Sequence, residues 1–566
     1  MNNNSKVFIL GLDGATFDIL LPMAARGELP NLAALMKDGV RAPLNSTIFH
    51  HSAPAWTSFA TGKNPGKHGI LGFTRIMSGT YQLALVNGTD NAEPTMWEVL
   101  SRHGKRVIVN NIPMTYPPKP VNGFLVSGLD TPSLTSPFTH PPELREEILR
   151  VAPDYKINLH LGGYLTSDRR RVKALKILSD SIQARAKVLL YLMGKYDWDF
   201  GAVRFNSPDN VQHQYWKFMD ESHPEHDPRS AKELKEAIGS IYRELDGVVG
   251  RMRTAVGPEG TLLVMSDHGA GPRTGKSVYL NEWLRSQNLL ARVGGKKKGG
   301  LRRMVDDATH AAKGKTISFL LRTLPPEAKN AILKFFPQAA SKTATYLRFS
   351  GINWAQTKAF VGEVEGIRIN LASRYPEGSV PDSEYEALRS RIIDEVVKIT
   401  DPETNERVFK VVCRKEDVFS GGAVADFPDI VVIPREVYNM SPRFFRGNER
   451  HDGFVVKDEH WRKISGSHRQ HGIFIMAGPH CRKGEVLPVA EILDIFPTAL
   501  YRMGLPIPDD VDGKVIEAAF EPEFLAANPI RVAKSAGGGK RGQGDIYSED
   551  DESKLIDSLR GLGYID

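Results

Sequence analysis

Carboxylate and imidazole side chains recur beside apolar runs of the sequence, in a pattern that could bind metal ions. The apolar run at 7–10 leads into Asp13, and the run at 261–265 is followed by Asp267 and His268. Each candidate lies at or just after the end of a predicted strand, so a parallel sheet would gather them at its carboxyl edge. The candidate ligands are Asp13, Asp209, His213, Asp267, His268 and His468.

This mixture of carboxylate and imidazole ligands suits zinc, with manganese as the alternative at higher coordination. The set is too large for one tetrahedral ion but fits two ions, which together clamp the attacking and leaving oxygens of an in-line displacement at phosphorus. Such a reaction needs a nucleophile, either a metal-bound water or a hydroxyl side chain. Ser52, Thr57 and Ser58 all offer hydroxyls, and their spacing alone does not select one.

Several other basic side chains near these motifs are interpreted as ordinary loop or surface residues. A loop histidine is more often hydrogen-bonded to backbone than bound to a metal, and an isolated cationic side chain is usually solvated. The residues interpreted in this way are His50, His51, His68, Lys67 and Arg204.

The alternation of apolar strands and amphipathic helices predicts an α/β fold with a large, mostly parallel central sheet flanked by helices. Strands are predicted at 7–10, 106–110, 198–205, 261–265 and 472–477. Long helices are predicted at 168–196 and 231–252, where apolar residues keep a helical period. The Gly/Pro-rich stretch 65–70 is predicted to be a loop, and Pro497 is expected to kink a short helix at 493–503.

The domain organisation is predicted from shifts in composition along the chain. Residues 1–280 and 349–528 are expected to form one catalytic domain, interrupted by a basic inserted cap or lid at 281–348 that contains Lys296-Lys297-Lys298. A solvated lid that packs its apolar face on the core is favoured over an element that contacts a membrane surface. Residues 529–566 are expected to be a flexible tail with a short terminal helix at 555–564.

Composition limits the classes of protein to which the chain can belong. Its 566 residues are 41% hydrophobic and 25% charged, as in soluble globular enzymes. The net charge of +7 is a modest excess for this length, and no nucleic-acid partner is predicted. Two cysteines cannot form a disulfide framework. With no signal-peptide pattern and no long apolar run, a cytoplasmic location is expected. The oligomeric state stays open.

The order of these motifs resembles the alkaline phosphatase superfamily and, within it, the type I phosphodiesterase/nucleotide pyrophosphatase family. The resemblance covers residues 6–515. The motifs that carry it are Asp13-Gly14; Ser52-Ala53-Pro54 with Thr61-Gly62, Pro65 and His68-Gly69-Ile70; Pro208-Asp209 to His213; Ser266 to Gly269; Gly466-Ser467-His468 with Gly478-Pro479; and the closing segment 494–513.

The resemblance implies an alkaline-phosphatase-like fold and a role for each candidate residue. One divalent ion, most simply zinc, would be held by Asp209, His213 and His468, with His468 preferred to His471 by the motif. The second ion would be held by Asp13, Asp267, His268 and the Ser52 oxygen. Counting back from Thr61-Gly62 makes Ser52 the nucleophile, which implies a covalent phosphoseryl intermediate and a small phosphate ester as the substrate.

Two positions depart from the family pattern. Ser52 stands where nucleotide pyrophosphatases usually have threonine, and Phe73 stands about where they have an asparagine that holds a phosphate oxygen. Tight nucleotide specificity is therefore not expected. The alternatives are a sulfatase, against which Trp56 argues because it occupies the arginine position of the sulfatase motif, a phosphomutase-type phosphotransferase, and a non-catalytic anion-binding protein.

Overall fold

The structure is a computed structural model of the chain. It describes residues 6–159, 161, 164–273, 275–293, 349, 351–362, 366–445, 453–457, 464–539, 542 and 546–562. Among these residues, no helix has both the length and the apolar character that crossing a membrane requires. The cytoplasmic location stays a prediction.

Ten strands of the described chain form one central sheet, whose main path runs β20-β2-β19-β9-β1-β8-β5-β6-β7. The inner strands β9 (Thr261–Met265), β1 (Val7–Leu12), β8 (Phe200–Phe205), β5 (Val107–Ile112) and β6 (Gly123–Ser127) are parallel. In contrast, β19 (His471–Ala477) runs antiparallel to both β9 and β2 (Val40–Asn45). The short strands β7 (Thr139–His140), β20 (Glu485–Val486) and β21 (Ala490–Glu491) lie toward the edges. The mostly parallel central sheet predicted from the sequence is confirmed.

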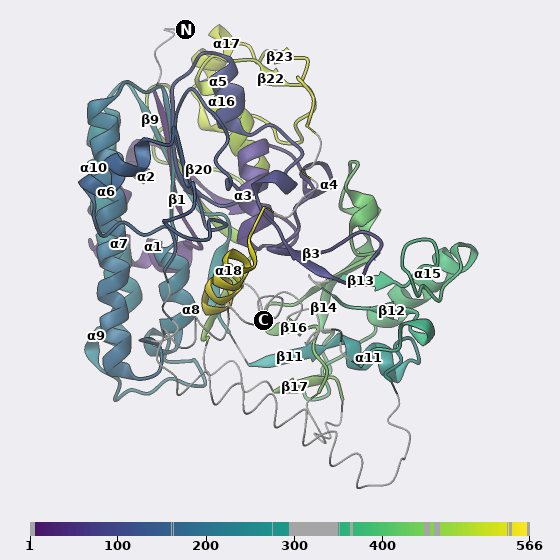
Figure 1. Ribbon diagram of the computed structural model, residues 1–566. Coiled ribbons are helices and arrows are strands. Elements are labelled where there is room, and N and C mark those ends of the chain that lie inside the picture. The colour runs from purple at the N-terminus through teal and green to yellow at the C-terminus, as the bar shows by residue number, and fades with distance from the viewer. Residues whose placement is uncertain are drawn as a thin grey trace.

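Helices cover both faces of this sheet, as Figure 1 shows. The apolar residues of β1 alternate between two cores: Phe8 and Leu10 pack into one, and Val7 and Ile9 into the other. The first core lies against α1 (Phe17–Ala25), α2 (Pro30–Asp38), α6 (Leu144–Val151), α7 (Asp168–Lys195), α8 (Ser207–Met219) and α10 (Ala237–Val256). The second core lies against α3 (Ser52–Thr61), α5 (Met96–Arg102) and α16 (Ile495–Arg502).

A second region follows β10 (Gly269–Pro272) and returns to the sheet through β18 (Gly466–Arg469). Its described strands form two small sheets: β16 (Tyr438–Ser441), β11 (Lys276–Tyr279) and β17 (Val455–Lys457); and β12 (Ala359–Phe360), β13 (Gly366–Ile369), β15 (Ile430–Pro434) and β14 (Phe409–Arg414). With α11 (Leu280–Ser286) and α15 (Tyr385–Val396), these strands surround a hydrophobic core of their own. Most of the predicted insertion, 294–348, lies outside the described residues, so the cap and the domain boundaries stay predictions.

Three local predictions were wrong. Residues Pro65–His68 form a short helix, α4, because Asn64 caps it through the Gly66 amide. The helix predicted at 231–252 is divided into α9 (Lys232–Lys235) and α10. Pro497 does not kink its helix: it lies in the first turn of α16, where the backbone N–H has no partner within the helix and proline is tolerated.

The last helix of the described residues is α18 (Glu549–Leu562), drawn in yellow in Figure 1, and it begins earlier than the terminal helix predicted at 555–564. Leu559 is buried in an apolar cluster with Ala53, which neighbours Ser52, and with Phe73. The Tyr547 hydroxyl donates a hydrogen bond of 2.7 Å to the Asp130 carbonyl. The helix is therefore anchored beside the start of α3.

The variant Leu559→Ala should loosen this anchor. Losing a buried leucine side chain costs about 2–5 kcal/mol, so the undocked population should rise at least about tenfold. Faster proteolytic cleavage within 546–562 would report the release, and Asp557→Ala, at an exposed position of the same helix, is the matched control. Equal cleavage rates in both variants would contradict the anchoring role of Leu559.

Candidate metal centre and nucleophile

The predicted ligands gather at the carboxyl edge of the central sheet. Asp13 follows β1, Asp267 and His268 follow β9, and α8, which carries Asp209, begins just after β8. His468 differs from the expectation that every ligand follows a strand, because it lies on β18 and precedes β19. Since β19 runs antiparallel to β9, its beginning lies at the same edge as the ends of the parallel strands. His468 therefore reaches the site from the opposite chain direction.

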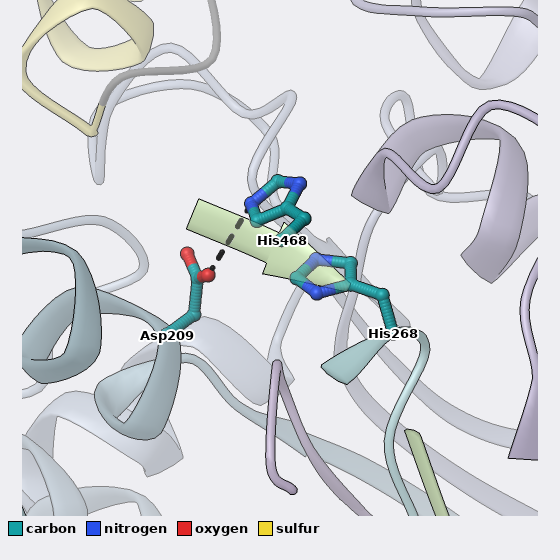
Figure 2. A group of neighbouring side chains, drawn as sticks. All are labelled: Asp209, His268 and His468. Atoms are coloured by element: carbon teal, nitrogen blue, oxygen red, sulfur yellow. Dashed lines mark ion pairs between the residues drawn. The ribbon is translucent and has the colours of Figure 1, made fainter. Parts of the chain in front are cut away.

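Asp209, His213 and His468 form the first group of candidate ligands. The Asp209 Oδ1 atom lies 3.1 Å from His213 Nε2 and 3.5 Å from His468 Nε2, and the two Nε2 atoms lie 3.0 Å apart. Asp209 and His213 share a face of α8 at a spacing of one turn. Figure 2 shows the Asp209 carboxylate directed toward the His468 ring.

The other ring nitrogen of each histidine is held by a backbone carbonyl. His213 Nδ1 lies 2.9 Å from the Gly466 carbonyl oxygen, and His468 Nδ1 lies 3.0 Å from that of His50. These contacts place the proton on Nδ1 and leave the Nε2 lone pair directed into the site, which is the arrangement typical of metal-binding histidines.

Asp13, Asp267 and His268 form the second group, and all three are fully buried. His268 Nε2 lies 3.4 Å from Asp267 Oδ2 and 3.8 Å from Asp13 Oδ1. Within the described part of the chain, these two carboxylate oxygens have no hydrogen-bond partner. Buried charged oxygens without a partner are costly, so both are suited to binding a cation.

The two groups are adjacent because His268 belongs to both. Its ring stacks on that of His468 with centroids 3.8 Å apart, and its ligand atom also groups with those of Asp209 and His468 (Figure 2). The geometry therefore brings together all six ligands predicted from the sequence, in two neighbouring groups.

Burial and mutual proximity shift the pKa values of these side chains. Burial, reinforced by the Asp13 carboxylate, raises the pKa of Asp267 to about 7. Burial alone would also raise the pKa of Asp209, but His213 and His468 hold it well below its usual range. Burial and the neighbouring His268 lower the pKa of His468, so this ring is neutral and able to act as a ligand at neutral pH.

The pKa of Asp267 predicts a pH dependence for ion binding to the metal-free protein. A divalent ion must displace the proton that Asp267 holds below about pH 7, so affinity should fall about tenfold for each pH unit below that value. Competition with a chromophoric chelator across this range would measure the slope. Asp267→Asn lacks the titrating carboxyl and should have a shallower slope; an affinity that does not change with pH would contradict the prediction.

Ser52 is the hydroxyl that lies beside these groups. It is the first residue of α3 and is fully buried, and its Oγ atom lies 3.4 Å from His268 Nε2. The other two hydroxyls lie inside the helix and are engaged there: Thr57 donates to the Ala53 carbonyl at 2.7 Å, and Ser58 lies 3.0 Å from His68 Nε2. The positive end of the helix dipole at Ser52 favours an anion at this position.

Two residues that contact the site were not found by sequence reasoning. Arg204, predicted to be a solvated charge, is only 1% exposed and forms an ion pair with Asp13. Trp56 donates a hydrogen bond of 2.9 Å to the same carboxylate. The available signal was the position of Arg204 inside an otherwise apolar strand, where a charge needs a buried partner. Lys67 is partly exposed and pairs with Asp512 instead.

The mostly parallel sheet thus has acidic and imidazole side chains at its carboxyl edge, beside a serine at the start of a helix. Residues 7–444 match the model of the type I phosphodiesterase / nucleotide pyrophosphatase family, and the chain belongs to this family. The family predicted from the motifs is confirmed.

Solved structures similar to this chain include two ectonucleotide pyrophosphatases and a phosphonate hydrolase. Murine ectonucleotide pyrophosphatase / phosphodiesterase 5 is 12% identical, with a TM-score of 0.44, over 88% of this chain and 95% of that one. The human protein of the same name is 11% identical, with a TM-score of 0.46, over 93% and 99%. Phosphonoacetate hydrolase from Sinorhizobium meliloti 1021, with phosphonoformate bound, is 16% identical, with a TM-score of 0.48, over 88% and 95%. A sequence comparison with curated proteins found no match.

Proposed function

We propose that this protein is a two-metal-dependent hydrolase of phosphate esters that works through a covalent phosphoseryl intermediate on Ser52. Membership of the family places the chain among the phosphoric ester hydrolases. The observation that carries the finer proposal is the position of the Ser52 hydroxyl beside two adjacent groups of buried ligand atoms.

The donor atoms in the site fit two divalent ions. Asp209, His213 and His468 would hold one ion through Oδ1 and the two Nε2 atoms, and zinc suits this mixed set, with manganese as the alternative. Asp13, Asp267, His268 and the Ser52 oxygen would hold the other. When bound, the ions supply Lewis-acid polarisation of the phosphoryl group and favour the ionised form of the serine hydroxyl.

Ser52 would carry the covalent step. Its Oγ forms a bond to phosphorus as the bond to the leaving-group oxygen breaks, and water then hydrolyses the phosphoseryl ester and restores the serine. The start of α3 supports this step, because its backbone amides and helix dipole favour negative charge at Ser52.

The substrate class is a small phosphate ester, whether diester, monoester or nucleotide pyrophosphate. Phe73 is buried in the apolar cluster with Ala53 and Leu559, where it offers no polar group to a phosphate oxygen. This supports a substrate range wider than nucleotides. Trp56 is engaged with Asp13, which argues further against the sulfatase alternative.

A substrate panel on metal-analysed protein tests the proposal. Aryl phosphomonoester, aryl phosphodiester and aryl sulfate substrates would be compared, with and without an added acceptor alcohol. Turnover of at least one phosphate ester without sulfate turnover is expected. Turnover of the sulfate alone would mean that the protein is a sulfatase. Transfer of the phosphoryl group to the alcohol in preference to water would favour the phosphotransferase. No turnover with metal bound at both sites would favour the anion-binding protein.

A further inference from the structure

We propose that Trp56 and Arg204 are positioning residues that fix the Asp13 carboxylate so that only its Oδ1 atom is offered to a metal ion. This inference rests on the metal-dependent function proposed above. It assigns a role to two residues that lie outside the predicted ligand set.

The two oxygens of Asp13 have different surroundings. Oδ2 accepts a hydrogen bond from Trp56 Nε1 at 2.9 Å and forms the ion pair with Arg204 Nε. Oδ1 has no hydrogen-bond partner among the described residues and faces His268 Nε2 at 3.8 Å. One oxygen is thus fully engaged by protein donors, and the other faces the second group of ligands.

The donors reach Asp13 from two further elements of the fold. Arg204 lies on β8, directly opposite Gly11 in the register with β1, and Trp56 comes from α3. A Cβ atom at Gly11 would lie 2.3 Å from Trp56 Cη2, so any side chain at this position would push the indole ring away. Gly11 therefore makes room for the ring that donates to Asp13.

Burying so many charged groups together costs free energy unless the charges compensate one another. Arg204 is 1% exposed, and burying a guanidinium is unfavourable without a fixed anionic partner. Asp13 and Asp267 are both buried near His268, so the Arg204 charge compensates them while no ion is bound. The Trp56 hydrogen bond adds no charge to the site and fixes the orientation of the carboxylate.

Partners that orient a metal ligand typically account for about 10–100-fold in metal affinity. Trp56→Phe removes the indole N–H without changing the charge, and the smaller ring that remains is the reason for a matched tryptophan control. Arg204→Lys keeps the charge but loses the fixed geometry of the guanidinium. We expect each variant to lower the zinc affinity of the site that contains Asp13 by about 10–100-fold. The zinc affinity of the other site should change by no more than about twofold.

The test is a zinc titration of the metal-free full-length chain by calorimetry, with thermal melting recorded for each variant. Trp97→Phe is the matched control for the indole, because Trp97 is buried in the same core. Arg502→Lys is the control for the guanidinium, because Arg502 is also buried but donates to Thr261 at the start of β9, at the opposite edge of the sheet. Both controls should bind zinc like the wild type.

Three results would overturn the inference. Unchanged zinc affinities in Trp56→Phe and Arg204→Lys would overturn it alone and leave the proposed function intact. If both sites lost zinc affinity equally, and the two control variants lost it as well, these residues would act only through general stability. A wild-type chain that binds no zinc or manganese would overturn the proposed function and, with it, this inference.

Discussion

Replacing Ser52 by alanine should lower the kcat of phosphate-ester hydrolysis by at least about a thousandfold, because the variant has no atom to form the covalent intermediate. Ser52 is the hydroxyl at the start of α3, and its Oγ lies 3.4 Å from His268 Nε2. The side chain is small and makes no apolar contact that alanine cannot replace, so the variant should fold. Steady-state hydrolysis of an aryl phosphate, with metal content measured on the same sample, gives the ratio of kcat values.

The neighbouring hydroxyls provide matched controls for this variant. Thr57 and Ser58 are buried in the same helix, but their hydroxyls bond to the Ala53 carbonyl and to His68. Thr57→Ala and Ser58→Ala should each cost about 0.5–1.5 kcal/mol of stability through the lost hydrogen bond and reduce kcat by less than about tenfold. If Ser52→Ala kept its activity while Thr57→Ala lost it, the nucleophile assignment would be wrong.

Removing bound divalent ions should also lower the kcat of hydrolysis by at least about a thousandfold. This ratio corresponds to about 4 kcal/mol of lost transition-state stabilisation. Without ions, the buried carboxylates of Asp13, Asp209 and Asp267 would repel an anionic ester. Dialysis against a chelator, followed by metal analysis and assay, measures the loss. Adding zinc or manganese should restore activity and raise the melting temperature, with about 4 kcal/mol of stabilisation at about 1,000 times the Kd.

The specificity of this loss can be checked within the same preparation. Chelator-treated protein should keep its secondary structure, because the central sheet has large apolar cores on both faces that contain no ligand residue. Protein that hydrolyses phosphate esters at the full rate after metal analysis finds no divalent ion would contradict the two-metal proposal.

Much of the fold could be predicted because its central strands are continuous apolar runs. The strands β1, β8 and β9 are buried on both faces, and strands buried in this way are typical of a parallel sheet covered by helices on both sides. Asp13, Asp209 and Asp267 follow these strands, so their common edge follows from the sheet alone. The family match over 7–444 agrees with the motifs that carried this prediction.

The rest depends on pairings that hydrophobic patterns do not encode. The apolar run of β19 gives no sign that the strand is antiparallel, yet that direction is what brings His468 to the site. The contact between His213 and Gly466 joins residues 253 positions apart. Similarly, the sequence does not reveal the partner of Arg204, because Asp13 is far away in the chain and comes next to it only where β1 and β8 pair. In the second region, hydrophobic patterns also give no sign that β11 pairs with β16 and β17 from much later in the chain.

The most direct test of the central claim is the stereochemical course at phosphorus. An aryl phosphate ester made chiral with oxygen isotopes and sulfur would be hydrolysed by the metal-loaded wild-type protein, and the configuration of the product determined. Each in-line displacement inverts phosphorus, so attack by Ser52 followed by attack of water predicts net retention. Net inversion would mean a single direct attack by water and would contradict a phosphoseryl intermediate on Ser52.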